Sequence, residues 1–179
     1  MLFHATSSLA APPAPADKIK AAYIYQLTHF IAWPNPASTN KDFPICILGK
    51  EPITQELAPL HQRQQGEHFI KVLHPKTIRD TADCRILYIA ESKQHQLHTI
   101  LHYLHHDLHD KPILTVSSLP NFAANGGIIG FVILNKKVRL EINPACARHA
   151  KIKLNAKLLE VANIVGNVAT NDSLGATCP

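Results

Sequence analysis

Residues 125–143 constrain the fold most tightly, because they have the pattern of two strands joined by a short turn. The segment starts with a glycine pair, a turn signal, and continues as an apolar run from Ile128 to Leu134. After a polar break, apolar and polar residues alternate from Val138 to Asn143, which is the period of a strand with one solvated face. We therefore predict a β-hairpin with its first strand buried on both faces and its second half exposed. A doubly buried strand needs helices above and below its sheet.

The rest of the chain supplies helices and strands in alternation. Apolar spacing and helix-start signals predict helices over 18–32, 52–62, 93–109, 144–150 and 155–165, with Asp17 and Asn143 as the expected caps of the first and fourth. Short apolar runs predict strands over 43–49, 69–73, 85–90 and 113–117. This order indicates an α/β fold: a three-layer sandwich with a mixed, mostly parallel sheet and a C-terminal antiparallel hairpin.

A chain of 179 residues is long enough for one domain with its own core. We assign that domain to residues 17–166, with a leader over 1–16 and a tail over 167–179 that we expect to be disordered. The leader has the small and apolar residues that end an export signal, and a disordered cytosolic tail is the alternative. No apolar run reaches the roughly 18–20 residues that span a bilayer, so we expect no direct membrane insertion.

No motif of a common enzyme active site is present in the chain. It lacks a serine nucleophile elbow, a Walker loop and a dinucleotide-binding glycine fingerprint, and its carboxylates are scattered. We therefore expect no enzymatic activity and no cofactor. The formal net charge of +5 permits an anionic partner, but no basic cluster is interleaved with aromatic residues, which argues against nucleic acid.

Six histidines fall within the predicted helix over 93–109. They occupy an arc beside the leucine stripe, so we expect the leucines to face the core and the histidines to face solvent. The i, i+4 spacing of His98 and His102 can chelate a transition metal, and His105 lies on the same arc. Because no HExxH motif is present, these three are candidates for metal or proton sensing rather than catalysis. A solvated helix face is the simpler interpretation.

A basic run follows the hairpin. Between Lys136 and Glu160 lie seven lysines and arginines against two glutamates, a balance that attracts acidic protein surfaces or lipid headgroups. Ile152 and Leu154 interrupt the run at alternate positions. They are either core residues or an apolar contact surface rimmed with charge.

The four cysteines, Cys46, Cys84, Cys146 and Cys178, form no CxxC motif, which argues against tetrahedral zinc. A bridge between Cys46 and Cys84, which lie in or beside apolar strands, would stabilise the fold by roughly 3–4 kcal/mol. Two buried free thiols, the usual state in the cytosol, are the alternative.

Five segments in order resemble the YfiR-like family of periplasmic proteins. They are AAYIYQLTHFIAWP, FPICILG, DCRILYIAES, ILTVSSLPNFAANGGIIGFVILNKKVRLEIN and ACARHAKIKLNAKLLEVANIV, within residues 18–166. The resemblance implies an exported, non-enzymatic α/β protein, often a homodimer, that represses an inner-membrane diguanylate cyclase by binding its periplasmic domain. It also implies that an outer-membrane lipoprotein can sequester the repressor, and that the output is the level of cyclic di-GMP and hence biofilm formation.

The resemblance implies roles for particular residues as well. Cys46 and Cys84 match the family's first disulfide pair, which makes the expected repressor redox-sensitive. The family's second pair, close to the hairpin, has no counterpart, so Cys146 and Cys178 are left with their pairing open. The implied partner surface is an apolar patch that corresponds here to Pro144, Ala147, Arg148, Ile152 and Leu154. The alternative function is a periplasmic small-ligand or metal sensor that uses the histidine-rich helix.

Overall fold

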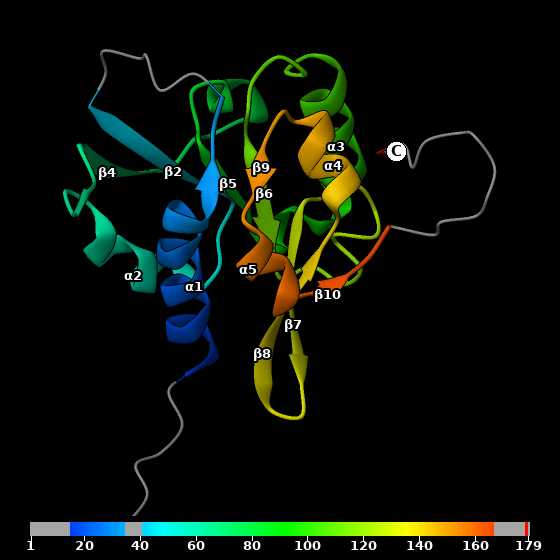
Figure 1. The fold of residues 1–179 in the computed structure, drawn as a ribbon. Helices are drawn as coiled ribbons and strands as arrows, with labels where there is room; N and C mark the ends of the chain where they lie inside the picture. Colours follow the sequence, from blue (N-terminus) through cyan, green and yellow to red (C-terminus); the bar gives the residue numbers. More distant parts are fainter. Residues whose placement is uncertain (1–14, 35–40, 167–177, 179) are drawn as a thin grey trace, which may run out of the picture.

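The computed structural model describes residues 15–34, 41–166 and 178. One eight-stranded sheet runs through the molecule with helices on both faces, and a two-stranded sheet lies beside it (Figure 1). The predicted leader and tail lie almost entirely outside the described residues, so their disorder stays a prediction.

The chain alternates between helices and strands along most of its length. The helices are α1 (Ala16–Phe30), α2 (Ile53–Leu57), α3 (Leu97–His106), α4 (Pro144–His149) and α5 (Ala156–Glu160), with 3-10 turns over Ala58–Leu60, Ile78–Thr81 and Glu91–Gln96. The strands are β1 (Ile31–Ala32), β2 (Asp42–Leu48), β3 (Gln64–Gln65), β4 (His68–Leu73), β5 (Ile86–Ile89), β6 (Leu114–Ser117), β7 (Ile129–Leu134), β8 (Lys137–Ile142), β9 (Lys153–Leu154) and β10 (Asn163–Ile164).

The large sheet has the strand order β10-β8-β7-β6-β5-β2-β4-β3. Its central neighbours β4, β2, β5, β6 and β7 are parallel, whereas β8 is antiparallel to β7 and β3 is antiparallel to β4. The α/β class and the mixed, mostly parallel sheet with an antiparallel hairpin are therefore confirmed. The hairpin turn at Asn135 and Lys136 has positive φ at both residues, 50° and 60°, which suits the twist of a two-residue loop.

The core lies on both faces of the sheet. On one face, α1 and α2 pack through residues such as Ile24 and Leu57, which are fully buried. On the other face, α3 packs through Ile100, Leu101 and Leu104. Strands β5 and β6 are buried at every position for this reason, and the unbroken apolar sequence of β5 follows from it, whereas β6 also buries the polar residues Thr115 and Ser117.

The first hairpin strand differs from its prediction. β7 is buried only at its start, and Ile133 and Leu134 keep 60% and 53% of their surface exposed. The hairpin projects beyond the helices that cover the rest of the sheet (Figure 1). β6 pairs with β7 only at Ile129 and Gly130, so the outer half of β7 has β8 as its only paired strand among the described residues. The alternation in β8 is present as predicted.

Three helices differ from their sequence patterns in their bounds. Pro15, not Asp17, occupies the N-cap of α1, and the helix stops at Phe30 because residues 31–32 pair with β9. The helix predicted over 93–109 is α-helical only over Leu97–His106 and begins as a 3-10 turn. The last predicted helix is reduced to α5, and the chain then joins the sheet edge as β10. In the first and last cases pairing with a distant segment overrides local propensity.

Candidate functional site

Two of the five residues predicted to bind a partner are part of the core. Asn143 caps α4, since its Oδ1 accepts hydrogen bonds from the N–H groups of Ala145 (3.1 Å) and Cys146 (3.2 Å). This cap turns one side of α4 inward, where Ala147 is 1% exposed. Lys151 then adopts a left-handed φ of 58°, and the reversal returns Ile152 to the interior at 3% exposed. The expectation that Ala147 and Ile152 form an exposed apolar patch is therefore wrong.

The other three predicted contact residues lie at the surface to different degrees. Pro144 and Leu154 are half-buried, and Arg148 is exposed. Leu154 pairs with Ile31 in the small β1–β9 sheet, so β1 lies along one edge of its strand. A role in partner binding stays a prediction for these three residues.

Exposed apolar side chains gather instead at the hairpin. Four of the six large apolar side chains described as exposed lie on the hairpin or on the segment beside it, and we call them the hairpin surface: Ile133, Leu134, Val161 and Ile164. β10 runs along β8, with Ile164 opposite Ile142, so the C-terminal segment lies next to the hairpin. The exposure of the hairpin end could have been found from the length of the apolar run, because this run extends past the part of β7 that pairs with β6.

The outer edge of the hairpin is partly open. In the described part of the chain, β10 pairs with β8 only at Glu141 and Ile142, and residues 137–140 have no strand on that side. Lys137 and Arg139 are exposed there. An open edge with apolar and cationic side chains can accept an extended segment of another chain by strand addition.

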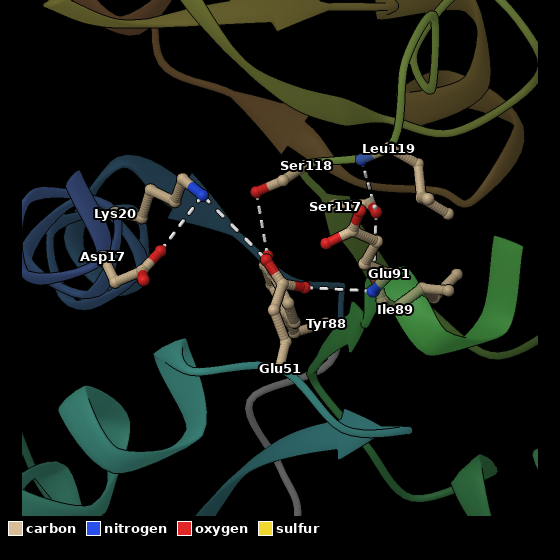
Figure 2. A network of polar contacts seen from close by, with 9 residues as sticks. All are labelled: Asp17, Lys20, Glu51, Tyr88, Ile89, Glu91, Ser117, Ser118 and Leu119. Atoms are coloured by element: carbon tan, nitrogen blue, oxygen red, sulfur yellow. Dashed lines mark hydrogen bonds and ion pairs between the residues drawn. The ribbon is translucent and has the colours of Figure 1, made fainter.

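A buried polar network occupies the carboxyl ends of β5 and β6 (Figure 2). The Tyr88 hydroxyl donates to Glu51 Oε1 at 3.0 Å and lies 2.9 Å from Ser118 Oγ. Glu51 Oε2 accepts the Glu91 N–H at 3.0 Å. From α1, Lys20 Nζ lies 3.9 Å from Glu51 Oε1 and forms a 3.1 Å ion pair with Asp17.

The network stabilises the fold and does not form a ligand-binding site. Tyr88 is fully buried, and the side chains of Glu51 and Lys20 are only 6% and 10% exposed. Burial raises the pKa of Tyr88 far above its ordinary range, and the negative charge of Glu51 adds to the rise. Ligands of α/β proteins often bind at this end of a sheet, but here the protein's own side chains satisfy one another and attach α1 to the strands.

The four cysteines form two disulfides. Cys46 in β2 is joined to Cys84 in the turn before β5, and both are buried against α3. This is the pair that the family resemblance implied. Cys146 in α4 is joined to Cys178, the one described residue of the C-terminal tail.

The histidines do not act as one group. Five of the six are exposed, including His98 and His102, whereas His105 is half-buried. The His105 ring lies against His149, with 5.5 Å between ring centroids, and its Nε2 is 3.5 Å from Cys178 Sγ. The structure therefore separates His105 from the other two candidate ligands and places it beside the second disulfide.

A groove of about 530 Å³ opens at the amino ends of β2 and β5. Trp33 and Arg85 line it, and Trp33 Nε1 is buried without a hydrogen-bond partner among the described residues. The Arg85 guanidinium lies over the Phe43 ring at 5.4 Å and forms no ion pair within the described ranges. Burial lowers the pKa of Arg85.

Together these features define an α/β domain that is closed by disulfides, carries an exposed apolar hairpin and keeps its buried polar groups for internal contacts. None of its described helices is long and apolar enough to cross a bilayer. The chain belongs to the family described as YfiR/HmsC-like, whose model matches residues 17–163. This family is one of periplasmic regulators rather than enzymes.

A solved structure shares the fold. It is the crystal structure of a conserved domain protein from Vibrio cholerae O1 biovar El Tor strain N16961, with a TM-score of 0.56 and 10% sequence identity. The similarity covers 81% of this chain and 59% of that one, so the present chain spans less than two thirds of its length. At this identity the likeness concerns the fold alone. No curated protein matches the chain significantly.

Proposed function

We propose that the protein represses a membrane-bound diguanylate cyclase by binding its periplasmic domain, and that the hairpin surface makes the contact. Family membership supports the regulatory role. The observation that carries the contact site is the exposure of Ile133 and Leu134 at the end of a projecting hairpin. Their side chains point to opposite faces of the hairpin, so a partner that covers both would enclose its end.

The hairpin surface has the composition of a binding site. Ile133 and Leu134 still expose more than half of their surface, so a partner that covers them fully gains about 1–2 kcal/mol from each. The exposed cations at the tip, Lys136, Lys137 and Arg139, would attract an acidic partner and set its orientation. Repression follows if the inactive cyclase conformation binds more tightly than the active one.

Two other partners belong to the same proposal. The family resemblance implies a homodimer and an outer-membrane lipoprotein that sequesters the repressor. A second copy of the chain could use the open edge of β8, since two such edges can pair with each other. Competition between these occupants and the cyclase would make repression adjustable.

The test replaces both exposed hairpin residues, with the variant Ile133→Asp/Leu134→Asp. We expect binding to the purified cyclase domain to weaken at least about 30-fold in calorimetry, because about 2 kcal/mol or more of apolar contact is lost. The matched control is Phe69→Asp/Leu73→Asp on β4, where the two side chains are 40% and 44% exposed. Circular dichroism establishes that both variants are folded. Equal affinity of wild type and the hairpin variant for the cyclase domain would show that the hairpin does not make the contact.

The groove beside Trp33 and Arg85 favours one second function, the sensing of a small anionic ligand. The half-buried Arg85 guanidinium and the Trp33 indole N–H, which have no ion pair and no hydrogen-bond partner within the described residues, can both donate to carboxylate or phosphate oxygens. Calorimetry with small carboxylates and phosphates tests this function. Heat that disappears in Arg85→Ala would support it, and no heat with any of them would eliminate it.

A further inference from the structure

The C-terminal disulfide lies in a corner that also holds a histidine. Cys178 Sγ lies 3.5 Å from Nε2 and 4.0 Å from Nδ1 of His105, and 3.7 Å from the carbonyl oxygen of Gly126. The candidate ligand atoms of His105, Cys146 and Cys178 all lie within 4.8 Å of one another, and the described residues contain no second group of three that is as close. These side chains come from α3, α4 and the tail, which are distant in the sequence.

We propose that reduction of the Cys146–Cys178 disulfide turns this corner into a binding site for Zn²⁺ or a similar thiophilic divalent ion. His105 and the two thiolates would be the protein ligands. Metal and disulfide would then be alternative ways of attaching the same tail residue to α4.

The spacing suits tetrahedral zinc. Zinc–sulfur bonds of about 2.3 Å and zinc–nitrogen bonds of about 2.0–2.1 Å place a ligating nitrogen and sulfur roughly 3.5 Å apart in a tetrahedron. His105 Nε2 and Cys178 Sγ are already at this separation. The Cα atoms of Cys146 and Cys178 are 4.7 Å apart, so the two thiolates can reach one ion without a large movement of the backbone.

The surroundings offer a fourth ligand. A cavity of about 20 Å³ lies between His105, Cys146 and His149, with apolar walls from residues such as Leu104 and Ile128. This volume is enough for one water molecule. His149 packs edge-on against His105, and its Nε2 lies 3.3 Å from the His105 carbonyl oxygen. A water in the cavity can complete four-coordination, since His149 is not among the side chains whose ligand atoms lie within 4.8 Å of one another.

Reduction of the Cys146–Cys178 disulfide requires one external reductant, a dithiol. The dithiol gives two electrons and two protons to the Cys146–Cys178 bond and becomes a disulfide itself, which leaves two free thiols on the chain. Binding of the divalent ion then displaces both thiol protons, and His105 binds as the neutral imidazole.

The two disulfides differ in their access to a dithiol. Cys178 is half-buried, whereas Cys46 and Cys84 are 1% and 5% exposed in the core. An attacking thiolate must reach a sulfur along the bond, so the C-terminal bridge is reduced first. The chain thus keeps the Cys46–Cys84 bridge under mild reducing conditions, while the metal corner becomes available.

The test uses the full chain treated with a dithiol under anaerobic conditions and freed of excess reductant. Alkylation and mass analysis establish which cysteines are reduced. Titration with Co²⁺ should then give one ion per chain, with a thiolate-to-cobalt charge-transfer band and the visible bands of tetrahedral cobalt, and Zn²⁺ should displace it. The oxidised chain should show neither band.

Variants assign the ligands. His105→Ala should weaken Co²⁺ binding at least about 10-fold, Cys146→Ser/Cys178→Ser should abolish the charge-transfer band, and His98→Ala/His102→Ala should leave both unchanged. The serine variant also controls for any binding by reduced Cys46 and Cys84. The proposal is overturned by a reduced chain that binds no metal, by unchanged binding in His105→Ala, or by binding that needs His98 and His102. All readouts are made on the isolated chain, so they are independent of cyclase binding.

Discussion

Replacing Tyr88 with phenylalanine removes one hydroxyl from the interior and leaves the ring in place. The hydroxyl contacts Glu51 and Ser118 at 3.0 and 2.9 Å, and Tyr88 is fully buried. Without it, Glu51 Oε1 keeps only Lys20 at 3.9 Å, although Oε2 still accepts the Glu91 N–H. The change therefore isolates the contribution of one charge-assisted hydrogen bond to the attachment of α1.

The expected cost in the free energy of unfolding is about 2 kcal/mol. A hydrogen bond to a charged group contributes about 1.5–3 kcal/mol, and no cavity opens because the ring remains. For a domain of this size, about 2 kcal/mol lowers the melting temperature by about 4–8 °C.

The effect should depend on pH in one direction. The pKa of Tyr88 in the folded chain is raised above its ordinary value of 10.0, mainly by burial. Because the pKa of Tyr88 is higher in the folded chain than in the unfolded chain, its contribution to stability is complete below the unfolded-state pKa. The contribution decreases as the pH rises above that value. We expect a constant difference between wild type and Tyr88→Phe from about pH 6 to 9, and a smaller difference above about pH 10 because only wild type must keep this hydroxyl protonated.

Urea unfolding followed by circular dichroism measures both effects. The matched control is Tyr23→Phe, whose ring packs against Phe131 at 6.1 Å and whose hydroxyl makes no hydrogen bond within the described residues. The control should change stability by less than about 0.5 kcal/mol. A similarly small loss for Tyr88→Phe, or a loss that grows above pH 10, would contradict the assigned role of the network.

Two further predictions concern the fold. Removing the core bridge with Cys46→Ala/Cys84→Ala should cost about 3–4 kcal/mol in non-reducing urea unfolding, because the bridge closes a loop with a sequence separation of 38, and a loss below about 1 kcal/mol would speak against this role. Asn143→Ala should cost about 2–3 kcal/mol, because the buried side chain caps α4 and also donates to the Ala123 carbonyl at 2.9 Å. The comparison is the exposed cap Asn155, whose side chain accepts only the Lys157 N–H in the described structure. Asn155→Ala should cost about 1 kcal/mol or less, and equal losses in the two variants would show that burial of Asn143 adds nothing to its cap.

The sequence alone determined the class of fold and the positions of most elements. Apolar runs such as 86–89 and the alternation in 138–142 are local properties, and a sheet covered by helices is the arrangement that buries both kinds of strand. Asn143 could be identified as a cap because its preference depends on the residues that follow it directly.

Which apolar residues are available to a partner depends on tertiary packing. Ile133 and Ile152 are both apolar residues near exposed cations, yet one is 60% exposed and the other 3%. The difference arises because β7 extends past β6, whereas the turn at Lys151 brings Ile152 back to the core. In the same way, the approach of His105 to Cys178 depends on how α3, α4 and the tail pack, and helical periodicity grouped His105 with His98 and His102 instead. Burial and ligand sets depend on contacts between distant segments, and no local pattern contains that information.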